Sequence, residues 1–385
     1  MASTTSRGTL GRVLVIGGNG FLGHHIVNQA LGDWSAVAVS SIDLRCDKNR
    51  NPGASYHECD ITDGPKLASL MGELAPDVVI HTASPAASSD TSVSKSLFQR
   101  VNVEGTRAVI QACRSTPSVK ALVYTSSASV ISDNETDLRN ADERWPVVRG
   151  AQQKEYYSET KAAAEQLVLE ANRATADDDD DDDNNKKQGL LTTSLRPAGI
   201  FGEGDVQTLA GFLKAYRTGK TNIQLGDNTN IFDFTYVGNV AHAHLLAARA
   251  LLLTARATTA PLDHEKVDGE VFIITNDSPC YFWDFARAVW KAAGHQSPPG
   301  GAAQSVWTLG KGTSLVLGSL SEFAFGLMGN PPTFTRVRAV MATMTRYYNI
   351  TKAKTVLGYE PLWTLQEGVT RGVGWFLEQE KGAAQ

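Results

Sequence analysis

The fold is decided near the start of the chain, where residues 13–23 read VLVIGGNGFLG. The four apolar residues predict a buried strand, and a helix-compatible stretch through Ala30 follows the glycines directly. Glycine is needed where the backbone turns tightly, approaches a diphosphate and packs a helix against a strand. The diphosphate then faces the free N–H groups of the helix N-terminus. This context favours a dinucleotide-binding turn over a glycine-rich turn without chemical purpose.

An acidic residue predicts which dinucleotide is bound. Asp43 ends the next predicted strand, about 20 residues after the last glycine, where an acid hydrogen-bonds the ribose diol of NAD and repels the extra phosphate of NADP. NAD is therefore expected, with NADP left open because Arg45 could neutralise that phosphate; a capping or solvent-facing Asp43 is the alternative. Asp60 and Ile61 follow the third strand and are expected near the adenine, unless they form an ordinary Asp-Thr turn.

Short apolar runs alternate with amphipathic helical patterns through the first half of the chain. Strands are predicted at 13–16, 36–42, 77–81, 121–125 and 191–195, with helices at 97–113 and 157–172 among them. Near-continuous Val, Ile and Leu suit strands buried on both faces. The predicted fold class is α/β: a Rossmann-type, doubly wound parallel sheet with a smaller C-terminal α/β substrate-binding region.

A length of 385 residues indicates one large α/β unit or two fused subdomains. We expect an NAD(P)-binding domain at 1–198 and a mainly substrate-binding region at 199–385, partly interleaved with the first. The aspartates at 177–183 repel one another, so residues 177–187 are predicted to form an acidic, disordered surface loop. A calcium site is disfavoured there because the carboxylates are not spaced by glycine turns.

Composition excludes several classes of function. The net charge is −5, and because the aspartate run carries −7, the rest of the chain carries +2. Without a basic stripe, nucleic acid is not an expected partner. The 4 cysteines have no metal-ligand spacing, so we expect reduced thiols and no metal site.

The N-terminal residues and one apolar stretch predict where in the cell the protein is located. Residues 1–12 lack the apolar segment of a secretory signal, which predicts a cytoplasmic chain. The apolar stretch 315–328 is shorter than the roughly 18 residues that a membrane span needs, and Glu322 interrupts it. Its length favours a buried helix that lines a substrate pocket; the alternative is a helix that lies on a membrane without crossing it.

Tyr157 and Lys161 stand four residues apart in a predicted helix, so their side chains share one face. A free phenol has a pKa near 10, and a neighbouring ammonium favours its phenolate. Tyr157 is therefore a candidate general base toward an alcohol, and Lys161 can also hydrogen-bond the nicotinamide ribose. Without further context, such a pair is usually an exposed surface pair.

The context comes from the serines after the predicted strand 121–125. That strand end lies at the carboxyl edge of the sheet, where open α/β folds bind ligands. Ser127 is expected to hold the substrate oxygen beside Tyr157. Ser126 and Ser129 are competing choices, and any of the three serines could instead cap a turn or helix.

Together these motifs resemble the extended short-chain dehydrogenase/reductase family. Three more segments are similar to it: NVEGT at 102–106, LRPAGIFG at 195–202 and DFTYVGNV at 233–240. The resemblance implies Ser127, Tyr157 and Lys161 as the catalytic residues. It implies the following cofactor contacts: Gly17, Asn19, Gly20, Phe21, Leu22, Gly23, Asp43, Asp60, Ile61, Lys161 and Pro197.

Within that family the chain is similar to the 3β-hydroxysteroid dehydrogenase branch, and most to its decarboxylating members that act on sterol-4α-carboxylates. The segments that carry this are HTASP at 81–85, TSSASVI at 125–131, ITND at 274–277 with FW at 282–283, and PTFT at 332–335. The resemblance implies oxidation of the 3β-hydroxyl of a 4α-carboxysterol to the ketone, with the 4-carboxylate lost as carbon dioxide. It also implies peripheral contact with the cytosolic face of the endoplasmic reticulum and with other sterol-demethylation enzymes. A homodimer is a further expectation.

Three other functions stay open at this point. The first is a 3β-hydroxysteroid dehydrogenase that acts on another steroid or terpenoid without decarboxylation. The second is a nucleotide-sugar epimerase or dehydratase, whose pocket would need polar and cationic groups for a diphosphate. The second half of the chain is instead rich in aromatics that suit a polycycle or a plain core: Phe282, Trp283, Phe285, Trp290, Trp307, Phe323 and Phe325. The third, a non-catalytic NAD(P) sensor, is disfavoured because Tyr157 and Lys161 are both present.

Overall fold

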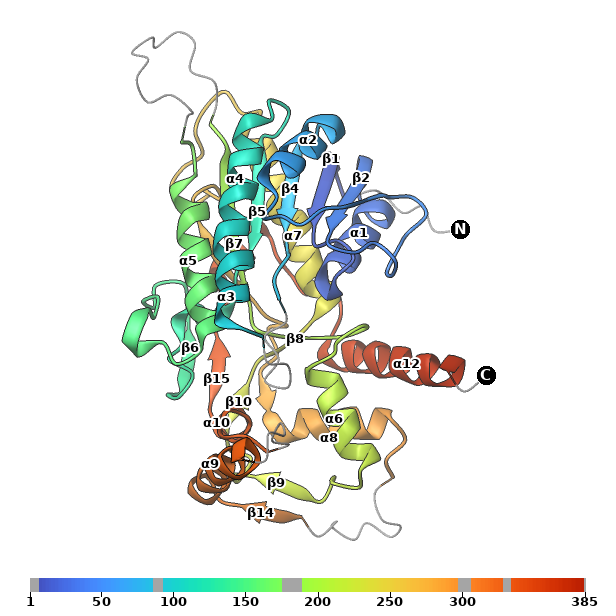
Figure 1. Cartoon of the computed structure of the whole chain (residues 1–385), viewed down its shortest axis with the longest axis vertical. Coiled ribbons are helices and arrows are strands. Elements are labelled where there is room, and N and C mark those ends of the chain that lie inside the picture. Colours follow the sequence, from blue (N-terminus) through green and yellow to red (C-terminus); the bar gives the residue numbers. More distant parts are fainter. Residues whose placement is uncertain (1–6, 86–92, 175–188, 297–305, 328–333, 384–385) are drawn as a thin grey trace.

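A seven-stranded parallel sheet forms the core of the first lobe, the upper part of the molecule in Figure 1. The computed structural model describes residues 7–85, 93–174, 189–296, 306–327 and 334–383. The strand order is β12-β7-β5-β4-β1-β2-β3, which confirms the predicted doubly wound α/β class. The strands are β1 (Thr9–Ile16), β2 (Ser35–Asp43), β3 (Ser55–Glu58), β4 (Val78–His81), β5 (Ala121–Thr125), β7 (Leu191–Pro197) and β12 (Val271–Ile274). The last strand comes from beyond residue 198, so the second half of the chain contributes to the sheet.

Helices cover both faces because successive strand residues point in opposite directions. In β1, Val13 and Val15 pack against α1 (Phe21–Gly32) and α7 (Val237–Thr254), whereas Leu14 and Ile16 face the other layer. That layer consists of α2 (Gly64–Leu74), α3 (Lys95–Phe98), the π-helical segment η1 (Gln99–Gly105), α4 (Thr106–Ser115) and α5 (Tyr156–Glu170). The predicted helices 97–113 and 157–172 correspond to α3–η1–α4 and to α5.

A second lobe lies beyond the carboxyl edge of the sheet (Figure 1). It is built around a four-stranded sheet of β13 (Cys280–Tyr281), β10 (Ile231–Phe232), β15 (Arg346–Tyr348) and β6 (Leu138–Ala141). Two ribbons pair β11 (Phe234–Tyr236) with β8 (Gly199–Phe201), and β14 (Trp307–Leu309) with β9 (Ile223–Leu225). Its helices are α6 (Thr208–Arg217), α8 (Phe282–Ala292), α9 (Lys311–Leu327), α10 (Arg336–Thr343) and α12 (Leu365–Ala383), whereas α11 (Thr351–Leu357) packs against β12 and α7 of the first lobe.

The aromatic residues of this lobe divide into core and surface. The rings of Phe234 and Phe285 stack at 3.8 Å, and Trp290 is also buried. Trp307 and Phe323 are exposed. Aromatic content therefore does not by itself indicate a pocket for a polycycle.

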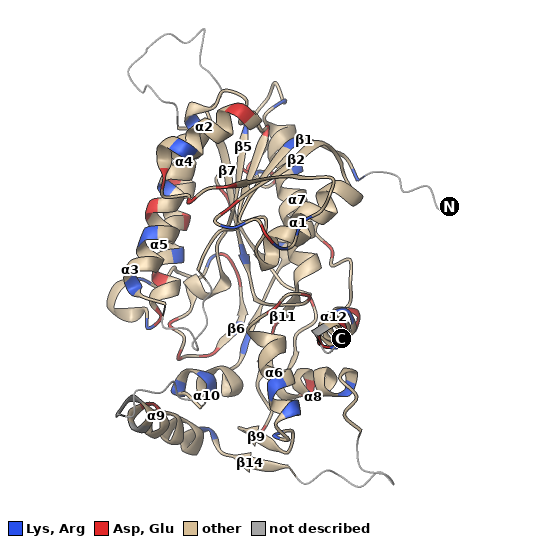
Figure 2. Ribbon diagram, turned by 45° about the vertical axis from the view of Figure 1, so that its right-hand side comes forward, with Lys and Arg blue, Asp and Glu red and all other residues tan. Residues whose placement is uncertain are grey.

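Helix α9 differs from the favoured expectation of a buried, pocket-lining helix. Val316, Leu320 and Phe323 on its outward face are 57 to 70% exposed. Figure 2 shows α9 at the far end of the second lobe, beside α10. No helix in the described parts of the chain is long and apolar enough to cross a membrane. The acidic run at 177–187 lies outside the described residues, as do Met328 and residues 332–333.

Candidate active site

The glycine turn leaves β1 and leads into α1 as its sequence predicts. Gly17 has a positive φ of 85°, and a Cβ atom there would lie 2.7 Å from the backbone nitrogen of Ala83. A Cβ atom on Gly23 would overlap the carbonyl of Gly17, so α1 packs closely only with glycine at this position. At Gly20 a Cβ atom would meet just one atom within 4 Å, the Gly17 oxygen at 3.1 Å. These environments match the roles of turn, helix packing and open approach for a diphosphate.

Asn19 and Asp43 tie the turn to the end of β2. Asn19 is buried, and its side chain accepts a hydrogen bond from Ser41 Oγ (2.8 Å) and donates one to the Lys48 carbonyl (2.7 Å). Asp43 Oδ2 accepts from the Asn19 N–H at 3.0 Å, and Oδ1 accepts from the Leu44 N–H at 2.7 Å. Asn19 thus stabilises the glycine turn. The Asp43 carboxylate is fixed at the edge of the sheet by hydrogen bonds and is not a freely rotating side chain in solvent.

Asp60 and Ile61 follow β3. Asp60 Oδ1 accepts hydrogen bonds from the backbone N–H (2.9 Å) and the hydroxyl (2.8 Å) of Thr62. The backbone hydrogen bond of Thr62 is the main cause that lowers the pKa of Asp60. Ile61 is buried against Gly105, where a Cβ atom would lie 2.8 Å from Ile61 Cγ1. The Asp-Thr turn considered from the sequence is present, and it keeps Asp60 charged.

The other predicted cofactor contacts lie at helix and strand ends. Phe21 and Leu22 open α1, whose N-cap is Gly20 and has no side-chain cap. Their contribution would come from backbone N–H groups, since the Leu22 side chain is in the core. Pro197 is buried at the carboxyl end of β7, next to Ile274 of β12.

Ser127 lies two residues after β5 and caps a short 3₁₀ helix, Ala128–Ile131. Its Oγ accepts hydrogen bonds from the N–H (3.1 Å) and the hydroxyl (2.8 Å) of Ser129, and Ser127 is close enough to Tyr157 to counter the rise in the pKa of that phenol. Ser129 also accepts from Ser158 Oγ at 2.8 Å, while Ser126 Oγ is buried with no hydrogen-bond partner among the described residues. Of the three candidate serines, Ser127 is the one that meets Tyr157.

Tyr157 and Lys161 lie one turn apart on α5. Lys161 is 2% exposed, and its Nζ donates to the main-chain carbonyl of Thr125. The same Nζ lies 4.4 Å from the ring centroid of Tyr124. The ring of Phe98 packs edge-on against Tyr157 at 5.8 Å. The fold therefore brings Ser127, Tyr157 and Lys161 together at the carboxyl edge of the sheet.

Burial controls the protonation of this set. It lowers the pKa of Lys161 to about 7, opposed by the nearby carboxylate of Glu165. It raises the pKa of Tyr157 to about 12, opposed by the hydrogen bond with Ser127. The sequence predicted a lowered phenol pKa; the structure shows the opposite direction because burial outweighs the other influences and Lys161 hydrogen-bonds a carbonyl.

Two buried pairs behind the site were not foreseen. Arg196 of β7 and Glu165 of α5 form an ion pair at 2.6 Å with side chains 4% and 3% exposed. Asn102 of η1 donates to Thr160 Oγ1 at 3.0 Å. The first pair had a signal in the sequence, since Glu165 follows Lys161 by four residues and Arg196 interrupts a predicted strand. The partners of these residues are distant in sequence, which sequence patterns do not encode.

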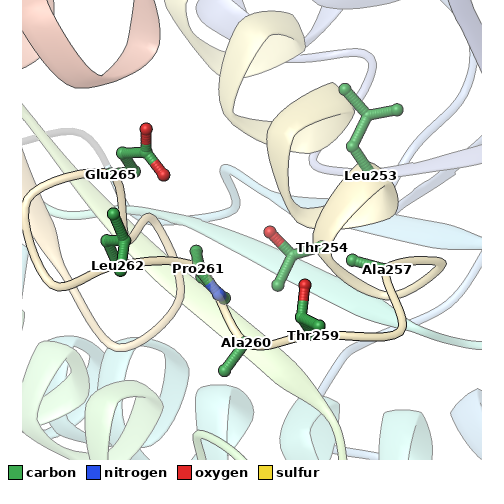
Figure 3. A pocket seen from close by; sticks show the side chains of 8 residues that line it. All are labelled: Leu253, Thr254, Ala257, Thr259, Ala260, Pro261, Leu262 and Glu265. Atoms are coloured by element: carbon green, nitrogen blue, oxygen red, sulfur yellow. The ribbon is translucent and has the colours of Figure 1, made fainter.

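An open hollow lies away from this site (Figure 3). It is lined by Leu253, Thr254, Ala257, Thr259, Ala260, Pro261, Leu262 and Glu265. Helix α7 meets Thr125 at the carboxyl edge of the sheet through His244, and farther along it Arg249 lies against Gly8, before β1. The hollow, at and beyond the end of α7, is therefore at the opposite edge of the sheet from Tyr157.

The parallel sheet, the glycine turn and the Ser-Tyr-Lys set define the class of the extended short-chain dehydrogenases/reductases. Comparison with protein families narrows this class. Residues 14–300 match the 3-beta hydroxysteroid dehydrogenase/isomerase family, and the chain belongs to this family.

Relatives match the chain over nearly its whole length. A Saccharomyces cerevisiae protein named sterol-4-alpha-carboxylate 3-dehydrogenase, decarboxylating, is 38% identical over 95% of this chain and 98% of its own. A human protein of the same name is 35% identical over 95% of this chain and 88% of its own.

Solved structures share the fold. UDP-glucose 4-epimerase from Thermotoga maritima, with UDP-glucose, has a TM-score of 0.66 at 21% identity, covering 96% of this chain and 99% of that one. The Thermus thermophilus UDP-glucose 4-epimerase in complex with NAD has a TM-score of 0.65 at 23% identity, covering 95% and 99%. At these identities the likeness concerns the fold alone.

Proposed function

We propose that the protein oxidises the 3β-hydroxyl of a 4α-carboxysterol with NAD and releases the 4-carboxylate as carbon dioxide. The observation that carries this is the placement of Ser127 beside Tyr157, with Lys161 one turn away on α5, at the ligand-binding edge of the sheet. The near full-length similarity to sterol-4-alpha-carboxylate 3-dehydrogenases supports the choice of substrate.

The residues present fit NAD. Gly20 leaves space in front of α1, and Asp43 places a carboxylate where the adenosine ribose would lie. That negative charge disfavours the additional phosphate of NADP. When bound, NAD supplies the acceptor for the hydride from C3 of the sterol.

The protein side of the oxidation follows from three side chains. Ser127 Oγ already accepts two hydrogen bonds from Ser129, so its own proton is the one it donates: toward Tyr157 in this structure, and to the substrate oxygen when the sterol is bound. As the C3–H bond breaks and its hydride leaves, the proton of the 3-hydroxyl passes to the phenolate of Tyr157. Because burial raises the pKa of Tyr157, the phenol keeps its proton in the chain without cofactor; the positive charge of bound NAD would favour the phenolate, which is then a strong base. Lys161, with a pKa lowered to about 7, can exchange a proton near neutrality.

Decarboxylation then needs no further group. The new ketone stands β to the 4-carboxylate, so the electron pair of the breaking C–C bond enters the ketone as an enolate while carbon dioxide leaves. A hydrogen bond from Ser127 to the enolate oxygen stabilises the developing charge. A proton added at C4 completes the balance.

The first experiment mixes purified protein, NAD and a 4α-carboxy-3β-hydroxysterol, and follows NADH absorbance and carbon dioxide together. Coupled formation of both supports the proposal. NADH alone indicates a plain 3β-hydroxysteroid dehydrogenase. If the sterol gives neither NADH nor carbon dioxide, and a UDP-sugar is converted in a parallel sample, the proposal is overturned in favour of an epimerase.

The assigned base is tested by Tyr157→Phe, which removes only the hydroxyl. Turnover should be abolished while NADH binding, followed by fluorescence, survives. The matched control is Tyr156→Phe, because Tyr156 directs its hydroxyl toward Gln99 (3.3 Å) and should leave turnover unchanged. Retained turnover in Tyr157→Phe would contradict the assignment. If Tyr157→Phe loses turnover but binds NADH as the wild type does, the protein is not a non-catalytic sensor.

We further propose that the protein lies on the cytosolic face of the endoplasmic reticulum through its second lobe. Trp307, Val316, Leu320 and Phe323 are large, exposed and apolar, and Lys311 between them is exposed as well. Figure 2 shows α9 almost without charged residues beside α10, which carries two arginines. An apolar face with basic residues nearby suits contact with an anionic membrane surface. A homodimer and contacts with other sterol-demethylation enzymes stay predictions.

A further inference from the structure

A buried hydrogen-bonded chain joins helix α7 to Lys161. His244 has no exposed surface; its Nδ1 lies 2.8 Å from the Val240 carbonyl oxygen, and its Nε2 lies 2.7 Å from Thr125 Oγ1. Because a carbonyl oxygen only accepts, we assign the ring proton to Nδ1. Nε2 therefore accepts a hydrogen bond from the Thr125 hydroxyl. Burial lowers the pKa of His244 to about 4, which keeps this tautomer neutral at physiological pH.

Thr125 is held on both sides. Its hydroxyl is fixed by His244, and its main-chain carbonyl accepts the hydrogen bond from Lys161 Nζ. Thr125 is the last residue of β5, and the peptide that carries its carbonyl also hydrogen-bonds the sheet, because the Ser126 N–H donates to the Leu195 carbonyl of β7 at 2.8 Å. The hydrogen bond from the Thr125 hydroxyl to His244 fixes the Thr125 side chain next to this peptide. The position of the carbonyl that holds Lys161 thus depends on β7 and on a residue of α7 together.

The surroundings of Lys161 make that carbonyl important. The groups that face it are Tyr124 from β5, His81 from β4, His244 from α7, Tyr157 and Glu165 from its own helix, and Arg196 from β7 through Glu165. Burial lowers the pKa of His81 to about 3, so both histidines are neutral. The ammonium form of the buried Lys161 then depends on few stabilising partners, of which the Thr125 carbonyl is hydrogen-bonded directly.

We propose that His244 is a positioning residue for the oxidation: it holds Thr125 so that the Thr125 carbonyl keeps Lys161 charged and in place beside Tyr157. This rests on the proposed function through the role of Lys161. It adds a residue 119 positions away from Thr125 in sequence, on a helix that contributes no group to the reacting atoms.

The test compares His244→Leu with Thr125→Val, which removes only the hydroxyl and preserves the carbonyl. Each variant should lower kcat about tenfold, as expected for losing one buried hydrogen bond, with little change in KM. Because Lys161 loses support for its charge, the alkaline fall of kcat should move to lower pH. The double variant should be no worse than either single variant, since both break the same link.

His242→Leu is the matched control. His242 is buried on the same helix, near Tyr359 at a ring distance of 6.3 Å, and its replacement should leave kcat and the pH profile unchanged. An unchanged kcat and pH profile in folded His244→Leu would overturn the proposal. So would an equal loss in His242→Leu, which would mean that packing alone is involved. If His244→Leu does not fold, Thr125→Val decides in the same way.

A second readout separates this inference from the proposed function. The dissociation constant of NADH, measured by fluorescence across pH, requires no sterol turnover. His244→Leu and Thr125→Val should shift its pH dependence toward lower pH, and His242→Leu should not. If the wild type fails to oxidise the sterol, the proposed function is wrong, but a shift in the pH dependence of NADH binding still supports the positioning role of His244. If the variants show no such shift, the positioning role of His244 is wrong.

Discussion

At the scale of single residues, we propose that Asp43 sets the choice of cofactor through its one negative charge. Both of its carboxylate oxygens accept backbone N–H groups, from Asn19 and Leu44, so the charge is fixed at the end of β2. Asp43→Asn keeps the shape but removes the repulsion of a 2′-phosphate. The ratio of kcat/KM for NAD to that for NADP should therefore fall by about tenfold or more, the effect of roughly 1.4 kcal/mol. Asp47→Asn, an exposed acid four residues later, should leave the ratio unchanged.

The buried Lys161 should make the free energy of unfolding depend on pH. Burial lowers its pKa from 10.5 to about 7, so between these values the unfolded chain binds more protons than the folded one. Stability of the wild type should consequently rise with pH across this window, by at most about 1.4 kcal/mol per pH unit from this group. Lys161→Met should have its largest stability advantage below pH 7, and the advantage should shrink toward pH 10.5. Denaturant unfolding at several pH values checks this, and a difference independent of pH would contradict it.

At the scale of elements, the contact between α1 and the glycine turn depends on Gly23. A Cβ atom there would overlap the Gly17 carbonyl, which is backbone and cannot move aside cheaply. Gly23→Ala should therefore lower the free energy of unfolding by about 1 to 3 kcal/mol and weaken NADH binding. Gly32→Ala in the same helix meets nothing within 4 Å and should be neutral or stabilising. Thermal unfolding and NADH fluorescence measure both; similar effects of the two variants would count against this role.

Two features of the helices could not be predicted from sequence patterns. The period of residues 97–113 indicated one helix, and the structure has a continuous helical stretch with the π-helical segment η1 inside it. Nothing in a hydrophobic period distinguishes a π turn from an α turn. Likewise, the composition of α9 could not show which side faces solvent, because that depends on the packing of α9 against α10.

At the scale of the whole molecule, the apolar end of the second lobe predicts membrane binding. The wild type should float with vesicles of phosphatidylcholine containing phosphatidylserine. Trp307→Ser with Phe323→Ser should abolish this, because both exposed rings are lost. The control pair, Val37→Ser with Val206→Ser, removes equally exposed apolar side chains elsewhere and should still float. Equal flotation of both double variants would contradict a docking surface on this lobe.

The sequence by itself determined the features that are encoded by short spacing. The glycine turn after β1, the acid at the end of β2, the serines after β5 and the one-turn separation of Tyr157 and Lys161 all follow from local geometry. The parallel sheet follows in the same way from alternating apolar runs and helices. The sequence did not determine how the sheet is completed, because β12 joins β7 from more than 70 residues farther along the chain.

Only the tertiary structure decided the environment of the candidate catalytic residues. The pKa of Tyr157 is raised because the folded chain buries the phenol, whereas the spacing to Lys161 had indicated the opposite direction. His244 reaches Thr125 because α7 packs beside the end of β5. Burial and hydrogen bonds between distant segments are properties of the packed molecule; the physical reason is that desolvation depends on everything that surrounds a group, while sequence spacing specifies only its neighbours on the same element.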